Sequence, residues 1–151
     1  MMRQIELQVI DPRAIQPEYG TTYAAGVDLA AVLDQPIEIP PLKATLIRTG
    51  IKINMMSVPE NLMAVIMPRS GKGHKEGKVL GNLTGVIDED YHGELMVSIW
   101  NRNSEKYITV EPGEKIAQLI FIPIIKADFK VVEEFSINTN RGEGGFGSTG
   151  G

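Results

Sequence analysis

Short apolar runs that alternate with polar residues constrain the fold of this chain most strongly. The runs 5–9, 37–39 and 51–53 place apolar side chains at every second position, and each is closed by Pro, Gly, Asn or Asp. Further apolar runs lie at 64–67, 95–100, 107–110, 116–122 and 129–132. Alternation of this kind predicts β-strands, and the 16 glycines and 9 prolines are placed between them. The sequence therefore predicts an all-β fold, a jelly-roll-like sandwich or distorted barrel.

Two segments refine this prediction. Ser57, followed by Pro59 and Glu60, resembles a capping box and predicts one short helical turn before Leu62, so we expect at most one short helix. The segment 116–125, IAQLIFIPII, is apolar on both strand faces. It is either a central sandwich strand, which the pattern favours, or a strand covered by a second subunit. Gln118 interrupts this run and needs a hydrogen-bond partner if it is buried.

Composition limits the classes of partner. A chain of 151 residues without cysteine can form one domain with its own core and no disulfides. No apolar stretch is long enough to span a bilayer, and the N-terminus lacks the apolar region of a signal peptide, so we expect a cytoplasmic protein without a membrane partner. A net charge of −4 argues against a nucleic-acid partner held on a broad basic face. An anionic ligand would need a local cradle.

The stretch 81–94, GNLTGVIDEDYHGE, is the strongest candidate for a site. Its turn residues predict a hairpin, and the apolar pair Val86 and Ile87 predicts a buried strand that ends at Asp88. A carboxylate at the end of a buried strand is held rigidly. The alternative, a solvated acidic turn with Glu89 and Asp90, is the commoner situation for such residues.

Three other stretches carry groups that suit an anionic ligand. MPRSGKG, at 67–73, combines two cations with Ser70 and two glycines that allow close backbone approach, although it lacks the P-loop spacing and could be an ordinary turn. AGVDL, at 25–29, supplies Asp28, which alone would be an ordinary strand-edge aspartate. RGEGGFGSTGG, at 141–151, has too little apolar surface to fold alone. It is either a flexible tail or a clamp for phosphate and base.

In chain order, AGVDL, PRSGKG, GNLTGVIDEDYHGE, PGEKIAQLIF and RGEGGFGSTG closely resemble the five motifs of the homotrimeric deoxyuridine triphosphate nucleotidohydrolases (dUTPases). The resemblance runs from Ala25 to Gly150. It implies a dUTPase-like β-clip domain at 1–138 and a flexible, substrate-closing arm at 139–151. It also implies Mg²⁺-assisted hydrolysis of dUTP to dUMP and pyrophosphate by a homotrimer with shared active sites. That reaction keeps uracil out of DNA and supplies dUMP for thymidylate synthesis.

The resemblance also implies a role for each site residue. Asp88 would activate the attacking water, Tyr91 would exclude a 2′-hydroxyl, and Asp28 would hold Mg²⁺ through water. The residues that would read uracil are Asn82, Gly85, Val86, Ile87 and Met96. Those that would hold the phosphates are Arg69, Ser70, Gly71 and Gln118, together with Arg141 and, on the terminal phosphate, Gly147, Ser148 and Thr149. Phe146 would stack on the base.

Two alternatives remain at this point. A dCTP deaminase of the same fold would need an acid/base group placed at the exocyclic amine of the base. A non-catalytic nucleotide sensor would keep the phosphate cradle but should lack the base, so the presence of Asp88 argues against it.

Overall fold

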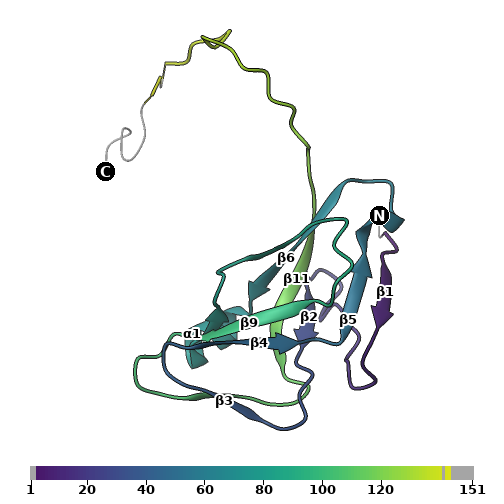
Figure 1. Cartoon of the computed structure of the whole chain (residues 1–151), viewed down its shortest axis with the longest axis vertical. Coiled ribbons are helices and arrows are strands. Elements are labelled where there is room, and N and C mark those ends of the chain that lie inside the picture. The colour runs from purple at the N-terminus through teal and green to yellow at the C-terminus, as the bar shows by residue number, and fades with distance from the viewer. Residues whose placement is uncertain (1–2, 141, 144–151) are drawn as a thin grey trace.

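The computed structural model describes residues 3–140, 142 and 143. Within them the chain is built almost entirely of short strands, with one short α-helix and one 3₁₀ turn (Figure 1). The strands are β1 (Glu6–Val9), β2 (Val27–Ala30), β3 (Ile37–Ile39), β4 (Ala44–Arg48), β5 (Ile51–Asn54), β6 (Leu62–Pro68), β7 (Lys78–Leu80), β8 (Gly85–Ile87), β9 (Met96–Asn101), β10 (Ile108–Val110) and β11 (Lys115–Pro123). The predicted all-β fold with a single short helix is confirmed.

The strands form two larger sheets and two strand pairs. One sheet has the order β2-β11-β6-β8 and the other β4-β9-β7, while β1 pairs with β5 and β10 with β3. Buried side chains from both larger sheets meet in one core, for example Leu29 and Leu119 from the first sheet with Ile47 and Ile99 from the second. Because alternate residues of a strand point to opposite faces, the alternating runs contribute one face each, for example Ile39, Ile51 and Ile53, and the other strands supply the rest of the core.

Strand β11 lies in the middle of the four-stranded sheet, between β2 and β6. Its central position is the one that the favoured interpretation predicts, and Ile116, Ala117 and Leu119 are buried. The rest of the run is not: residues 120–122 are only partly buried and Ile125 is exposed. Gln118 pairs with Asp28 on one side and with Met67 on the other, and its side-chain amide donates to the Pro68 carbonyl at 3.1 Å. Gln118 thus ties together two of the stretches that the sequence singles out.

The helix is not where the sequence predicts it. Ser57 ends the 3₁₀ turn η1 (Met55–Ser57), whose N-cap is Asn54, and no helix follows before Leu62. The α-helix is α1 (Ser70–Glu76), in the glycine-containing stretch that resembles a loop by sequence. Gly73 allows the helix to approach β7, because a Cβ there would lie 3.3 Å from the Val79 side chain, and Gly77 ends the helix with φ of 75°. Over the described residues, neither helical segment has the length and apolar character of a membrane span.

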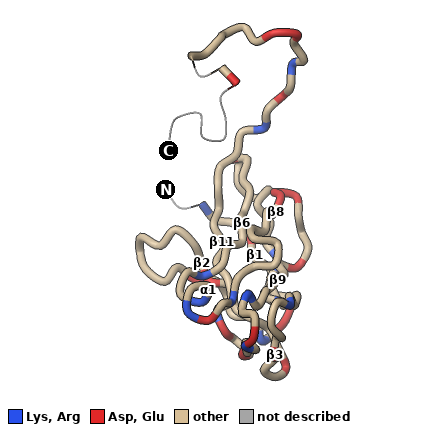
Figure 2. Tube along the Cα trace, turned by 90° about the vertical axis from the view of Figure 1, so that its left-hand side faces the viewer, with Lys and Arg blue, Asp and Glu red and all other residues tan. Residues whose placement is uncertain are grey.

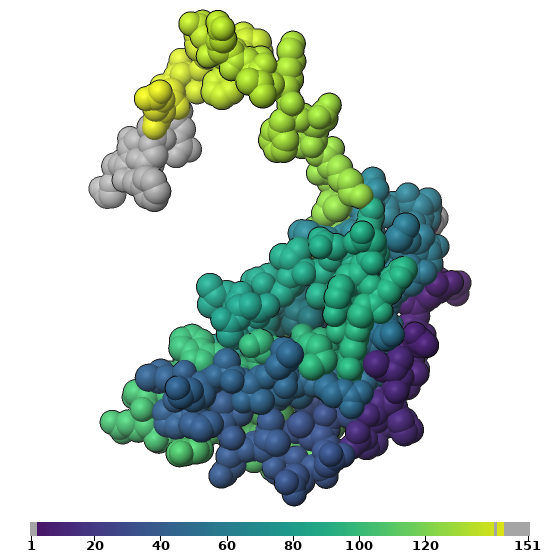
Figure 3. All heavy atoms as spheres, viewed as in Figure 1, coloured from purple at the N-terminus to yellow at the C-terminus, as the bar shows by residue number. Residues whose placement is uncertain are grey.

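The strand predicted at 129–132 is also wrong. The described segment 124–140 forms no strand, and it leaves the body of the molecule as an extended segment in Figures 1 and 3. Its large apolar side chains are exposed, among them Phe129, Phe135 and Ile125, the last at 96%. A β-prone composition forms a strand only where the segment pairs with another strand and buries one face, and among the described residues this segment does neither.

Candidate active site

Strand β8 is the outer strand of its sheet, and it positions the acidic stretch 88–91. It pairs only with β6, whereas β7 pairs with β9 in the other sheet, so the predicted hairpin is wrong and the turn 81–84 instead carries the chain from one sheet to the next. Only one face of the strand is buried as predicted: Gly85 is buried and Ile87 packs against the core, whereas Val86 is 61% exposed. Among the described strands, β8 therefore has one edge of backbone donors and acceptors without a strand partner.

Asp88 and Tyr91 stand at the two ends of one tight turn. The Tyr91 backbone N–H donates to the Asp88 carbonyl at 3.1 Å, which closes the turn directly after β8. Asp88 is exposed, and within residues 3–140, 142 and 143 its carboxylate has no hydrogen-bond or ion-pair partner. The turn thus carries a carboxylate at one end and an aromatic residue at the other, next to the strand edge that has no partner among the described strands.

A cavity of about 380 Å³ gathers a second group of predicted site residues. It is lined by Gly20, Ala24, Gly26, Asp28, Arg69, Ser70, Gly71, Lys72 and Gln118. Arg69 caps the helix α1 and Ser70 begins it, while Asp28 and Gln118 come from the adjacent strands β2 and β11. Two cations, a hydroxyl and an amide around one hollow suit a polyanionic ligand.

Asp28 is the one carboxylate in this cavity, and both of its oxygens face cations. Arg69 Nε lies 2.9 Å from one oxygen and Lys115 Nζ lies 3.0 Å from the other. Arg69 also donates to the Lys115 carbonyl at 3.2 Å. These contacts hold the Arg69 guanidinium near the N-terminus of α1.

The turn 88–91 and the residues that line the Arg69 cavity lie at opposite ends of β6. Ile87 is paired with Ala64, so Asp88 continues past β8 near Met63, whereas Ser70 follows the other end of β6 at Pro68. At about 3.3 Å per residue, the five residues from 63 to 68 separate the two groups by roughly 17 Å. One chain therefore does not bring its own Asp88 to its own Ser70.

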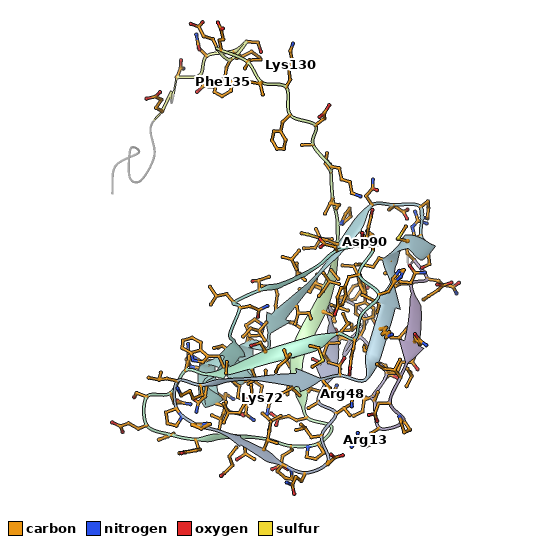
Figure 4. All side chains as sticks on the ribbon, in the orientation of Figure 1. Arg13, Arg48, Lys72, Asp90, Lys130 and Phe135 are labelled. Atoms are coloured by element: carbon orange, nitrogen blue, oxygen red, sulfur yellow. The ribbon has the colours of Figure 1, made fainter. Side chains whose placement is uncertain are left out.

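An ion-pair network fixes α1 against the strands. Lys72 and Lys78 contact the Glu114 carboxylate at 2.8 and 2.7 Å, and both also contact Glu76, at 3.0 and 2.9 Å. Figure 2 shows the charges of both signs interleaved around α1, and Figure 4 labels Lys72 there. Sequence reasoning missed this network. The four-residue spacing of Lys72 and Glu76 was the available signal, but nothing local points to Glu114.

The network perturbs the ionisation of its members. Partial burial opposes ionisation of Glu114, but hydrogen bonds from Lys72 and Lys78 outweigh it and hold the pKa of Glu114 below its usual value. The same hydrogen bond to Glu114 raises the pKa of Lys72. The charged form of each group is thus favoured in the folded protein.

Glu114→Gln is expected to lower the free energy of unfolding at pH 7 by about 1–3 kcal/mol, because the buried Lys78 then loses one of its charged partners. A lowered carboxyl pKa stabilises the fold above the unfolded-state value, about 4.3, and this contribution is lost as pH falls through the folded value. The difference in the free energy of unfolding between wild type and Glu114→Gln should therefore become smaller in acid. Urea unfolding at pH 7 and below pH 4 measures it, with the exposed Glu105→Gln as control. An equal gap at both pH values would contradict the assignment.

Five predicted residues lie outside the described residues. They are Arg141, Phe146, Gly147, Ser148 and Thr149. Their roles stay predictions. Asn82 lies in the turn before β8, and its side-chain amide is close to Gly85. Met96 begins β9 in the other sheet and is partly buried, so its place beside the other predicted base-reading residues stays a prediction.

Comparisons with known proteins identify the family of the chain. The dUTPase family model matches residues 13–150. The chain is 52% identical to the deoxyuridine 5′-triphosphate nucleotidohydrolase of Pectobacterium carotovorum and 51% identical to that of Klebsiella pneumoniae, each over 99% of both chains. The dUTPase of Staphylococcus bacteriophage 80alpha, solved with dUPNHPP, is similar in structure with a TM-score of 0.85 and 28% identity over 99% of each chain. The chain belongs to the dUTPase family of enzymes.

Proposed function

We propose that this protein hydrolyses dUTP to dUMP and pyrophosphate, with uracil read at β8, the phosphates held in the Arg69 cavity, and water activated by Asp88. The observation that carries the proposal is the turn 88–91, which joins Asp88 to Tyr91 at the end of β8. Within the described residues, the Asp88 carboxylate has no hydrogen-bond or ion-pair partner and the outer edge of β8 has no strand partner. The relatives named as deoxyuridine 5′-triphosphate nucleotidohydrolases are similar in sequence to this chain over 99% of its length. The reaction removes dUTP, which keeps uracil out of DNA, and supplies dUMP for thymidylate synthesis.

Uracil recognition uses the free edge of β8. The polar edge of the base hydrogen-bonds to the backbone from Gly85 to Ile87 as a neighbouring strand would, with Asn82 beside it and Met96 closing the pocket. A rigid backbone is suited to this task because its donors are oriented before the substrate arrives. A narrow pocket also rejects the methyl group of thymine.

The chemical step is an in-line displacement at the α-phosphorus. Asp88 accepts a proton from a water molecule while the oxygen of that water forms a bond to the α-phosphorus. The bond from the α-phosphorus to the α–β bridging oxygen breaks and releases pyrophosphate. Arg69, Ser70, Gly71 and Gln118 hold the phosphate chain and stabilise the negative charge that develops on the bridging oxygen. Tyr91 lies against the deoxyribose, where a 2′-hydroxyl would collide with its ring.

Each active site combines groups from different copies of the chain. The roughly 17 Å between Asp88 and Ser70 along β6 is too long for one triphosphate to bridge with both groups in contact with the α-phosphate. The exposed apolar side chains of the segment 124–138, including Phe129 and Phe135, also suit a surface on another copy. The family resemblance gives the closed assembly as a homotrimer.

Asp28 fits a magnesium ion that arrives with the triphosphate. It is the only carboxylate lining the cavity, and the described residues contain no cluster of three His, Cys, Asp or Glu side chains that could form a protein cage. Mg²⁺ keeps several waters and binds substrate phosphates, so one outer carboxylate suffices. When bound, the ion offsets the charge of the triphosphate. Arg69 and Lys115 form ion pairs with Asp28, and with Mg²⁺ beside that carboxylate their charges would be available to the phosphates.

The proposed division of the chain is a β domain at 1–138 and a substrate-closing arm at 139–151. Arg141 would pair with the γ-phosphate, Phe146 would stack on uracil, and residues 147–149 would close on the terminal phosphate. Stacking contributes only about 1–3 kcal/mol, whereas ordering ten residues costs on the order of 10 kcal/mol. Contacts with the terminal phosphates therefore provide much of the stabilisation of the closed arm.

A pyrophosphate-release assay tests the proposal. We expect release from dUTP, faster with Mg²⁺ than with a chelator, and release lower by at least about tenfold from dTTP, dCTP and UTP. Ammonia release from dCTP would indicate a deaminase instead. Tight binding of dUTP without release of any product would indicate a nucleotide sensor.

A further inference from the structure

Tyr91 lies directly on Gly93. A Cβ built on Gly93 would lie 2.4 Å from the Tyr91 hydroxyl oxygen, 2.5 Å from Cζ and 2.9 Å from Cε2. The backbone does not require glycine there, because Gly93 is not among the described glycines with positive φ, which are 50, 77, 113 and 142. The ring itself thus excludes a side chain at position 93.

The tip of the ring is held as well. The Tyr91 hydroxyl donates to the Glu94 carbonyl at 3.0 Å. Tyr91 is 42% exposed, and an exposed aromatic side chain samples several rotamers unless specific contacts select one. Contact with Gly93 at the ring and a hydrogen bond at the tip select one position.

The segment that carries this carbonyl is fixed in turn by residues 48–51. The Glu94 carboxylate accepts hydrogen bonds from Arg48 Nε at 3.1 and 3.2 Å and from the Gly50 backbone N–H at 2.8 Å. The Leu95 N–H donates to the Ile51 carbonyl at 2.9 Å, and the Thr49 hydroxyl donates to the Leu95 carbonyl at 2.6 Å. Arg48, labelled in Figure 4, is also held by Asp11 at 3.3 Å.

We propose that Gly93 and Glu94 are positioning residues that set the sugar specificity of the enzyme, by fixing the Tyr91 ring where it excludes the 2′-hydroxyl of a pyrimidine ribonucleoside triphosphate. The inference rests on the proposed function and deepens it. Steric exclusion of a single hydroxyl depends on ring position to within a fraction of its radius, so a small displacement of the ring admits ribose. Glu94 acts through its carbonyl, and its carboxylate keeps that carbonyl in place.

Gly93→Ala tests the seat of the ring. Its new methyl group displaces the ring without backbone strain, and we expect the ratio of kcat/KM for dUTP to kcat/KM for UTP to fall by about tenfold or more. If Gly93 only supported the fold, the substitution would lower kcat/KM for both substrates alike and leave their ratio unchanged. The thermal unfolding midpoint of each variant separates these effects. A well-folded Gly93→Ala with the wild-type ratio would overturn the inference.

A second pair of variants does not depend on the folding of Gly93→Ala. Glu94→Ala removes the acceptor for Gly50 and Arg48 and should lower the same ratio, whereas Glu94→Gln keeps an acceptor for the Gly50 N–H and should restore most of it. Glu89→Gln is the matched control: its side chain is 22% exposed, against 18% for Glu94, and it forms an ion pair with Lys126 in the same stretch. Its ratio should equal that of wild type. Equal ratios in Glu94→Ala and Glu89→Gln would refute the role of Glu94.

The outcomes separate the inference from the function on which it rests. If wild type hydrolyses dUTP and discriminates against UTP, an unchanged ratio in the variants overturns the positioning role alone. If wild type releases no pyrophosphate from dUTP, the proposed function fails and the positioning role fails with it.

Discussion

Asp88→Asn is expected to lower kcat for pyrophosphate release from dUTP by about 10²- to 10⁴-fold, because the amide cannot accept the proton of the attacking water. Asparagine has nearly the same shape, and within the described part of the chain the Asp88 carboxylate has no hydrogen bond or ion pair whose loss would destabilise the fold. Binding of a non-hydrolysable α,β-imido analogue should therefore stay close to wild type. Steady-state kinetics and isothermal titration calorimetry measure the two quantities separately.

Asp90→Asn provides the control for this substitution. Asp90 lies in the same turn, is exposed, and loses the same charge, so a general effect of charge on triphosphate binding would appear in both variants. We expect Asp90→Asn to retain near-wild-type kcat. Equal losses in the two variants, or a fully active Asp88→Asn, would remove Asp88 from its proposed role.

The fold could be predicted from sequence where alternation and turn residues coincide. The runs at 5–9, 37–39 and 51–53 became β1, β3 and β5 because each presents one apolar face to the core and ends at a residue that breaks the ladder. The run at 129–132 has the same composition but no partner within the chain, and pattern alone does not report a partner. The helix α1 was missed because its two glycines are typical of a loop, and the packing of Gly73 against β7 is not visible in the sequence.

The candidate site was predictable as a set of residues and not as an arrangement. The motifs identify Asp28, Arg69, Ser70, Asp88 and Gln118, but their grouping depends on which strands pair and in which register, and these pairings are non-local. The pairing of Arg48 with Glu94 spans 46 residues, and no local pattern indicates it. Gly93 resembled an ordinary turn glycine by sequence, and only the position of the Tyr91 ring shows why no larger residue fits.

The separation of Asp88 from Ser70 leads to the second large effect, which is expected when two inactive variants are mixed. Asp88→Asn lacks the proton acceptor, and Arg69→Ala lacks the guanidinium that holds the phosphates, so each alone should be nearly inactive. If one copy supplies Asp88 and another supplies Arg69, refolding the two variants together in equal amounts restores roughly a quarter of the sites, since half of the copies carry each intact group. If one chain supplied both groups, no intact site would form.

A second mixture distinguishes restored sites from trivial carry-over. Wild type refolded with an equal amount of the double variant Asp88→Asn/Arg69→Ala should keep roughly a quarter of wild-type activity if sites are shared and roughly half if they are not. Pyrophosphate release per total chain measures both mixtures. Activity in the first mixture no higher than the sum of its parts, together with half activity in the second, would place Asp88 and Arg69 of the same chain in one site. That result would require β6 to bend sharply between Met63 and Pro68, which its continuous pairing with β11 over 62–68 opposes.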